Sequence, residues 1–139
     1  MRAQTIYDIT MALMDEMLDN GNVDVNSTKD YLARTPGILT ILQTECIIAL
    51  KRIGAKVETL DAIRTMTDDV DLDDDICTGV LPYGLAARLL GQEDASLSNY
   101  FSSLYDEKLG TAVPTASSKY IAKQEQRPDV YSSLLRAGD

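Results

Sequence analysis

The fold is decided by one stretch of the chain, LPYGLAARLLGQEDASLSNYF, which spans residues 81–101. Its first half is apolar but includes Gly84, Ala86 and Ala87. A glycine within an apolar run indicates either close approach of the backbone to a ligand or close contact between helices. Neither phosphate-binding glycine pattern, G-x-G-x-x-G or G-x-x-x-x-G-K-S/T, is present. We therefore predict that these small residues serve helix packing.

Signals on either side of Gly91 predict a helical hairpin near residues 73–109. The first helix contains Pro82, which either kinks it or begins a fresh first turn. The second helix begins at Asp94, or at the residue before it, and continues to about Leu109. Two helices joined by about three residues fold back on each other as an antiparallel pair. The residues expected to pack in this hairpin are Gly84, Leu85, Ala87, Leu89, Phe101 and Leu104.

The N-terminal segment repeats apolar residues at helical spacing, which predicts an amphipathic helix over residues 3–18. Its apolar face is expected to consist of Ile6, Ile9, Leu13 and Met17. The helix should end in the sequence DNGN that follows it, because asparagine and glycine readily adopt the left-handed conformation that ends helices.

A longer apolar stretch predicts the central helix of the fold. Ser27 or Thr28 can cap a helical start, but Pro36 interrupts the pattern, so we expect the long helix from about Pro36 to a C-terminal cap at Gly54. Its apolar stripe is wide enough to need two neighbours and consists of Ile38, Leu39, Leu42, Cys46, Ala49, Leu50 and Ile53. Residues 55–67 lack a clear period, which leaves a short strand, an extended linker and a helical turn all open.

Composition restricts the class of protein. A chain of 139 residues with 45% apolar content fits one compact domain. Thirteen basic and twenty-two acidic residues give a net charge of -9, which argues against a surface for duplex DNA or anionic lipid. No apolar run approaches the roughly 20 residues that cross a bilayer, and the N-terminal segment mixes acids into its apolar positions. We expect a soluble intracellular protein that does not contact a membrane.

Residues that commonly carry catalysis are scarce. The chain has no histidine, which removes the imidazole base of most hydrolases. Glu45 and Glu58 sit singly and do not suggest paired-carboxylate chemistry. Cys46 and Cys77 are too isolated for a disulfide framework or a C-x-x-C metal site, so we expect two reduced, structural thiols. These observations predict a protein that is not an enzyme and has no catalytic residue and no cofactor.

Six aspartates crowd into residues 68–75, DDVDLDDD, and suggest a calcium loop. Such a loop needs glycine at its sixth position and glutamate at its twelfth. A loop that starts at Asp69 would have Asp74 and Val80 there, and one that starts at Asp71 fails in the same way. We therefore expect no specific metal site. The last aspartates should cap the next helix near its positive end, while the others stay in solvent.

The chain changes character after Gly110. Residues 1–110 carry nine basic and nineteen acidic side chains, a net charge of -10, and residues 111–139 carry four basic and three acidic, a net charge of +1. This tail is polar, yet it contains apolar residues that are poorly suited to solvent: Tyr120, Ile121, Val130, Tyr131, Leu134 and Leu135. We predict a helical body over 1–110 and an arm over 111–139 that orders on a partner. The alternative is a tail that folds back on its own body.

The sequence therefore predicts a mainly α-helical protein: a small helical bundle with a long central helix, a helical hairpin near residues 73–109 and an extended C-terminal arm. The order of its elements resembles that of the head-tail connector proteins, also called adaptor or head-completion proteins, of tailed bacteriophages and prophages. The resemblance covers about residues 1–110. It rests on an N-terminal helix with an Asp/Asn turn, on STKDYLARTPGILTILQTECI, and most of all on LDDDICTGVLPYGLAARLLGQEDASLSNYFSSLYDEKL at residues 72–109.

The resemblance implies a structural protein of the virion, assembled in the cytoplasm of a bacterial host and placed at the head-tail interface. It implies a ring of identical subunits, a dodecamer, that grips the portal protein with its termini and joins a downstream stopper or tail-completion protein. An acidic body would repel DNA, which could then slide through the ring without specific binding. The alternative from another class is a small acidic protein, monomeric or dimeric, that mimics DNA as an inhibitor or regulates a host protein.

Overall fold

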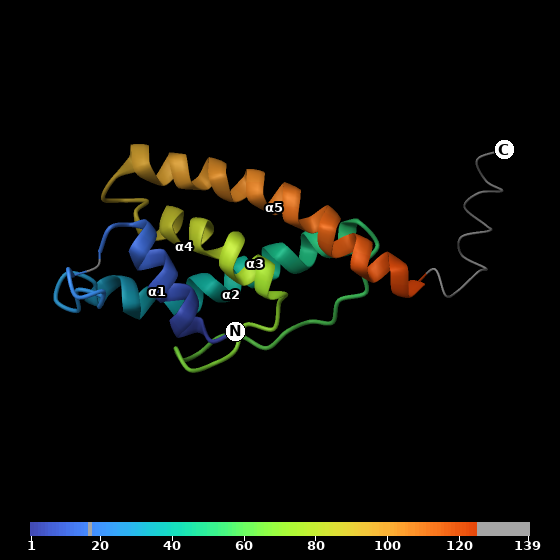
Figure 1. Ribbon diagram of the computed structural model, residues 1–139, viewed down its shortest axis with the longest axis horizontal. Coiled ribbons are helices and arrows are strands. Elements are labelled where there is room, and N and C mark those ends of the chain that lie inside the picture. The colour runs from blue at the N-terminus through green and yellow to red at the C-terminus, as the bar shows by residue number, and fades with distance from the viewer. Residues whose placement is uncertain (17, 125–139) are drawn as a thin grey trace.

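Five helices form the folded part of the chain in the computed structural model (Figure 1), which describes residues 1–16 and 18–124 and side chains as far as residue 113. The helices are α1 (Ala3–Leu13), α2 (Lys29–Arg52), α3 (Asp74–Gly79), α4 (Leu81–Leu89) and α5 (Ala95–Gln124). Within the described residues there is no strand, and one isolated bridge joins Arg2 to Asp69. The predicted class, a mainly α-helical bundle with a long helix, is confirmed.

The short helix α4 lies at the centre of the bundle. It contacts every other helix, and its contact with α5 is the most extensive in the molecule. Seven of its nine residues are buried: Leu81, Pro82, Gly84, Leu85, Ala86, Ala87 and Leu89. A helix that is apolar on nearly every side must be covered on every side. The apolar stretch at residues 81–89 is therefore the centre of the core.

The predicted hairpin is formed by α4 and α5, which run in opposite directions in Figure 1. Asp94 caps α5, because its Oδ1 accepts a hydrogen bond of 3.0 Å from the backbone N–H of Leu97. Pro82 lies in the first turn of α4, so the fresh first turn is the alternative that the structure adopts. A proline is tolerated there because the missing N–H has no helical partner in the first turn.

The N-terminal helix is shorter than predicted. It ends at Leu13, not Leu18, because Asp15 takes a left-handed conformation with φ 61°. The N–H groups of Asp15 and Glu16 then bond the carbonyls of Ala12, at 3.2 Å, and of Met11, at 2.9 Å. This pair of hydrogen bonds is the Schellman motif, which ends a helix. Gly21 also has a positive φ, 83°, but in a turn beyond the helix.

The buried face of α1 is rotated from the predicted one. Its buried residues are Ala3, Ile6, Tyr7, Thr10 and Met11. Of the predicted face, Ile6 is buried, Ile9 and Leu13 are half-buried, and Met17 lies outside the described residues. Tyr7 and Thr10 were missed because each is polar, and each finds a hydrogen-bond partner inside the fold. The Thr10 hydroxyl donates to the Ile6 carbonyl at 2.7 Å and the Tyr7 hydroxyl to the Thr28 carbonyl at 3.4 Å.

The long helix α2 begins at Lys29 and passes through Pro36, so the predicted start at Pro36 is wrong. Thr28 stands at the N-cap position, but its side chain makes no capping hydrogen bond, because its hydroxyl donates to the Asp24 carbonyl at 2.7 Å. Asp30 lies in the first turn. A proline inside a helix removes one hydrogen bond. Tyr31 and Thr35, which precede the proline, are buried, and tertiary packing of this kind offsets the lost hydrogen bond.

The last helix also runs further than predicted. It continues beyond Leu109, through Gly110 and Pro114, to Gln124. Val113 is only 6% exposed, so the first residues of the predicted arm pack on the body. Position 110 is therefore not an element boundary, because burial of Val113 favours continuing the helix across a glycine. Figure 1 shows the last turns of α5 projecting past the other helices.

Residues 55–64 form an extended linker, which settles the alternatives left open for this segment. Ala55 and Ile63 are buried and attach it to the core. The Thr40 hydroxyl accepts a hydrogen bond of 2.9 Å from the Ile63 N–H, and the Gln43 amide donates to the Asp61 carbonyl at 3.0 Å. None of the helices that the structure describes is long and apolar enough to cross a membrane.

Candidate functional site

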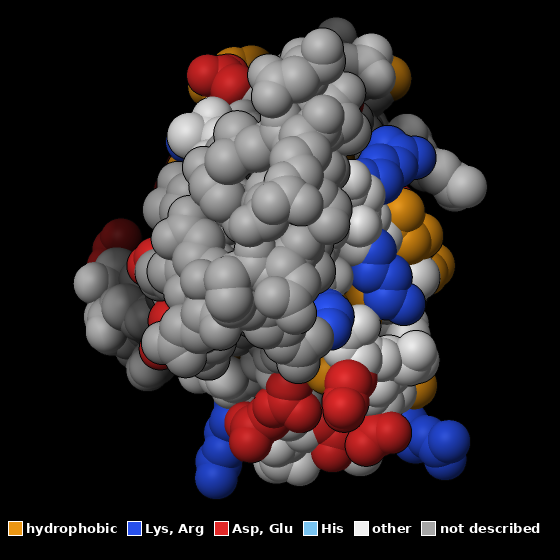
Figure 2. Space-filling model, turned by 90° about the vertical axis from the view of Figure 1, so that its right-hand side faces the viewer, with side chains coloured by type: hydrophobic (Ala, Val, Ile, Leu, Met, Phe, Trp, Pro, Cys, Tyr) orange, Lys and Arg blue, Asp and Glu red, His pale blue; other side chains and the backbone are white. Residues whose placement is uncertain are grey.

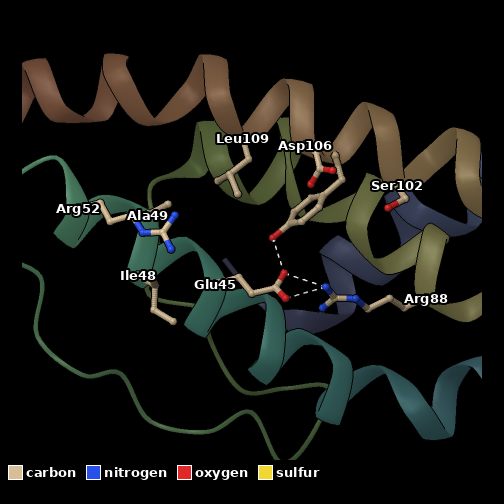
Figure 3. A pocket seen from close by; sticks show the side chains of 9 residues that line it. Glu45, Ile48, Ala49, Arg52, Arg88, Ser102, Asp106 and Leu109 are labelled. Atoms are coloured by element: carbon tan, nitrogen blue, oxygen red, sulfur yellow. Dashed lines mark hydrogen bonds and ion pairs between the residues drawn. The ribbon is translucent and has the colours of Figure 1, made fainter.

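A polar cluster joins three helices at one side of the core (Figure 3). It consists of Glu45 on α2, Arg88 on α4 and Tyr105 on α5. The Arg88 Nη2 donates to both carboxylate oxygens of Glu45, at 2.8 and 2.7 Å, and the Tyr105 hydroxyl donates to the same carboxylate at 3.0 Å. We call this set the Glu45 cluster. It connects the α4–α5 hairpin to the long helix.

Burial determines the protonation of the groups around Glu45. It raises the pKa of the Tyr105 phenol, and the neighbouring Cys46 and Glu45 raise it further. Burial also raises the pKa of the Cys46 thiol to about 12. Both groups are therefore neutral at physiological pH, Tyr105 as a hydrogen-bond donor and Cys46 as a buried thiol. The Glu45 carboxylate accepts three hydrogen-bond contacts, and the cluster thereby ties α2, α4 and α5 together.

The ion pair in this cluster is modest in energy. The side chains of Arg88 and Glu45 are 35% and 36% exposed, so water screens their attraction. One atom of the cluster has no partner in the described part of the chain: the Arg88 Nη1 is buried without a hydrogen bond. The cluster thus selects the relative position of α2 and α4 more than it adds stability.

Gly84 lies directly beneath this cluster, where α4 passes between α2 and α5. A Cβ atom at this position would stand 2.8 Å from the Leu42 Cδ2 and 2.8 Å from the Tyr105 Cδ2. Glycine is needed here because any side chain would occupy the space of both neighbours. Of the other predicted packing residues, Leu85, Ala87, Leu89 and Phe101 are buried, and Leu104 is half-buried.

A groove of about 420 Å³ opens beside the Glu45 cluster, between α2 and α5. Its α2 wall includes Ile48, Ala49 and Arg52, and its α5 wall includes Ser102, Asp106 and Leu109. Ile48 is 47% exposed, which is high for an isoleucine beside a core. Ile41 lies seven residues earlier on the same face of α2 and is 55% exposed. The surface of α2 thus offers apolar side chains that the described residues leave uncovered.

The acidic segment 68–75 contributes no residue to this groove. Asp73 takes the N-cap position of α3 without a side-chain capping hydrogen bond, and Asp74 and Asp75 lie in the first turn, near the positive end of the helix as predicted. The Asp68 carboxylate instead accepts hydrogen bonds of 2.8 and 2.9 Å from the N–H groups of Arg64 and Thr65. These two bonds lower the Asp68 pKa.

Four carboxylates gather around a hollow beside this segment, those of Asp61, Asp68, Asp69 and Asp71. No three acidic or cysteine side chains in the described ranges are placed to hold one metal ion. Figure 2, which views the end of the molecule toward which α5 runs, shows Asp and Glu side chains together at the lower edge and Lys and Arg side chains along one flank. The negative charge of the body is therefore unevenly distributed.

The sequence analysis missed the partner of Glu45 at the candidate site. Glu45 pairs with Arg88, and this pairing of residues 43 positions apart has no sequence signal. Cys46 and Cys77 are free and buried, as expected. Among the predicted arm residues, Tyr120 and Ile121 fall within α5, where only the backbone is described, and Val130, Tyr131, Leu134 and Leu135 lie outside the described residues.

Comparison with known proteins adds no assignment. No protein-family model, no curated protein sequence and no solved structure matches this chain.

Proposed function

We propose that this chain is a head-tail connector, or adaptor, of a tailed bacteriophage or prophage. In this role it is a structural protein of the virion and not an enzyme. Its subunits form a ring, a dodecamer by the resemblance, that extends the DNA channel between the capsid and the tail. Its partners are the portal protein on one side and a stopper or tail-completion protein on the other, while DNA passes through without specific binding.

The observation that carries the proposal is the course of α5. This helix begins at the hairpin in the core and continues as one element for 30 residues, past the other helices and into the predicted arm. A rigid helix that leaves the body can present the C-terminal segment to another protein while the core stays intact. The resemblance over residues 72–109 and the net charge of -10 on residues 1–110 agree with a channel protein.

The test is removal of the part of the arm that follows α5. Because Val113 packs in the core, the chain should be cut after Gln124 and not after Leu109, which removes residues 125–139 and leaves Tyr120 and Ile121 in place. The shortened protein should keep its helical circular dichroism and its cooperative thermal unfolding. It should also lose binding to portal rings, because several weak tethered contacts in a ring act together. Retention of normal binding by the folded, shortened protein would place the portal contact outside residues 125–139.

Native mass spectrometry separates this proposal from its rival. A connector mixed with portal rings should form a complex with several copies of the chain. A DNA-mimicking inhibitor or a regulator should stay a monomer or a dimer and bind a basic protein surface. The acidic hollow at Asp61 and Asp69 is the surface that would serve such a rival, so charge reversal there should weaken inhibitor binding and leave portal binding intact.

A further inference from the structure

The groove between α2 and α5 has apolar surface that the described residues do not cover. Ile48 is 47% exposed on one wall, and Leu109 is half-buried on the other. Arg52 stands at the end of the groove opposite Arg88 (Figure 3). Within the described ranges Arg52 has no ion pair. Its lining combines apolar side chains on both walls with the charged side chains of Glu45, Arg52, Arg88 and Asp106. Such a mixed groove suits a short peptide segment that carries both apolar and charged residues.

We propose that this groove binds the C-terminal segment of the same molecule, residues 129–135 (DVYSSLL), in an extended conformation. The inference concerns the free protein and does not depend on the connector role. The segment lies outside the described residues, and three kinds of observation point to it as the occupant: the length of chain that remains after α5, the spacing of its apolar residues and the charge at the end of the groove.

The length of the chain fits only an extended segment. From Leu109 to Gln124 the helix rises about 22 Å at 1.5 Å per residue. Six extended residues after Gln124 span about 20 Å, which brings residue 130 or 131 back to the level of Leu109. Residues up to 135 then cover a further 16 Å or so, more than the rise of about 10 Å between Ser102 and Leu109. A helical segment after Pro128 would reach only the mouth of the groove.

The apolar residues of the segment alternate in a way that matches two walls. In an extended chain successive side chains point to opposite sides. Val130 and Leu134 therefore face one side and Tyr131 and Leu135 the other, with a serine between the members of each pair. A groove between two helices presents apolar surface on both sides, at Ile48 and at Leu109.

The course of the helices sets the end at which the segment enters the groove, and a charged pair would fix its register there. A chain that returns from Gln124 meets the Arg52 end of the groove first, because α2 and α5 run in the same direction (Figure 1). Asp129 comes immediately before the apolar residues and would stand beside Arg52. An aspartate that meets an otherwise unpaired arginine at a partly exposed rim fixes the register of the segment more than its affinity.

The test is an intramolecular disulfide in the full chain. Ile48→Cys combined with Ser132→Cys should form a cross-link under mild oxidation, and Ile41→Cys combined with Ser132→Cys is the matched control on the same face of α2. Both α2 positions are exposed, and the native Cys46 and Cys77 are buried and do not compete. Because the tether concentrates the segment at the groove, the first pair should cross-link about tenfold faster in dilute monomer.

Equal rates for the two pairs would overturn the proposal, as would cross-links found only between molecules, which would assign the groove to a second copy. Arg52→Glu should slow the Ile48→Cys reaction several-fold, and Lys51→Glu, one residue away and outside the groove, should not. Equal effects of these two charge reversals would remove the Asp129–Arg52 contact from the proposal. Loss of portal binding has no bearing on any of these outcomes.

Discussion

The helix α4 and the acidic segment 68–75 are near neighbours in the sequence and opposites in structure. In α4 seven of nine residues are buried and one glycine fits between two neighbouring side chains. In the acidic segment Val70 is the one fully buried residue, and its backbone bonds the first residue of the chain at 2.8 Å. The two regions differ in what their side chains do. The size and shape of the side chains determine how α4 packs in the core, whereas the acidic side chains of the segment beside it determine the charge of the surface.

The largest effect is expected at the centre of α4. Gly84→Leu should lower the free energy of unfolding by about 1–3 kcal/mol, because a side chain there overfills a closed contact. Leu42 and Tyr105 would both have to move, and Tyr105 is restrained by its hydrogen bond to Glu45. Thermal or denaturant unfolding measures the change.

Gly110 is the matched control for this contact. A Cβ at Gly110 would meet nothing within 4 Å, and the residue lies inside α5. Gly110→Ala should therefore raise stability by about 0.5–1 kcal/mol, since alanine favours a helix more than glycine does. Gly84→Ala should lower it. If both substitutions shift the free energy of unfolding in the same direction, the close contact at Gly84 does not exclude a side chain from that position in α4.

The next effect concerns the rim of the core at Tyr105. Tyr105→Phe should cost about 1 kcal/mol, the usual net value of one hydrogen bond. The phenol has a raised pKa in the folded protein, so its contribution is complete below the unfolded-state value of about 10 and is lost as the pH rises through the folded-state pKa. Unfolding measured from pH 8 to 11 should show a shallower alkaline loss in the variant. Parallel curves for the two proteins would contradict the assignment.

A smaller effect is expected at Asp68 in the acidic segment. Asp68→Asn should lower the melting temperature slightly at pH 7, because the carboxylate accepts two backbone hydrogen bonds. The lowered pKa of Asp68 means that its contribution is complete above the unfolded-state value of about 3.9 and is lost as the pH falls through the folded-state pKa. The gap between variant and parent should close in acid. A gap that widens in acid would show a different cause.

The smallest effect is expected at Asp69, which is exposed. Asp69→Asn should leave the melting temperature nearly unchanged, since surface substitutions away from special contacts have small effects. Added calcium should also leave it unchanged, because only a ligand that binds the folded state raises stability. A saturable rise of several degrees, absent in Asp69→Asn, would instead make the hollow around Asp69 a cation site.

The hairpin could be predicted because its signals are local. Gly91 and Asp94 act on their own backbone, and the cap at Asp94 forms as expected. The predicted helix ends were wrong where burial outweighed a local signal. Helix α2 continues through Pro36 because Tyr31 and Thr35 are buried, and α5 continues through Gly110 because Val113 is buried. No local sequence pattern predicts that these three residues are buried.

The sequence by itself determined the helical class, the hairpin, the packing use of Gly84 and the change of composition toward the C-terminus, because these follow from periodicity, turn chemistry and charge along neighbouring residues. The tertiary structure alone decided which face of α1 is buried, how far α2 and α5 extend, and that Glu45 meets Arg88 and Tyr105 beside a groove. These features depend on residues 43 and 60 positions apart. Their pairing is selected by the packing of whole helices, which no local pattern encodes.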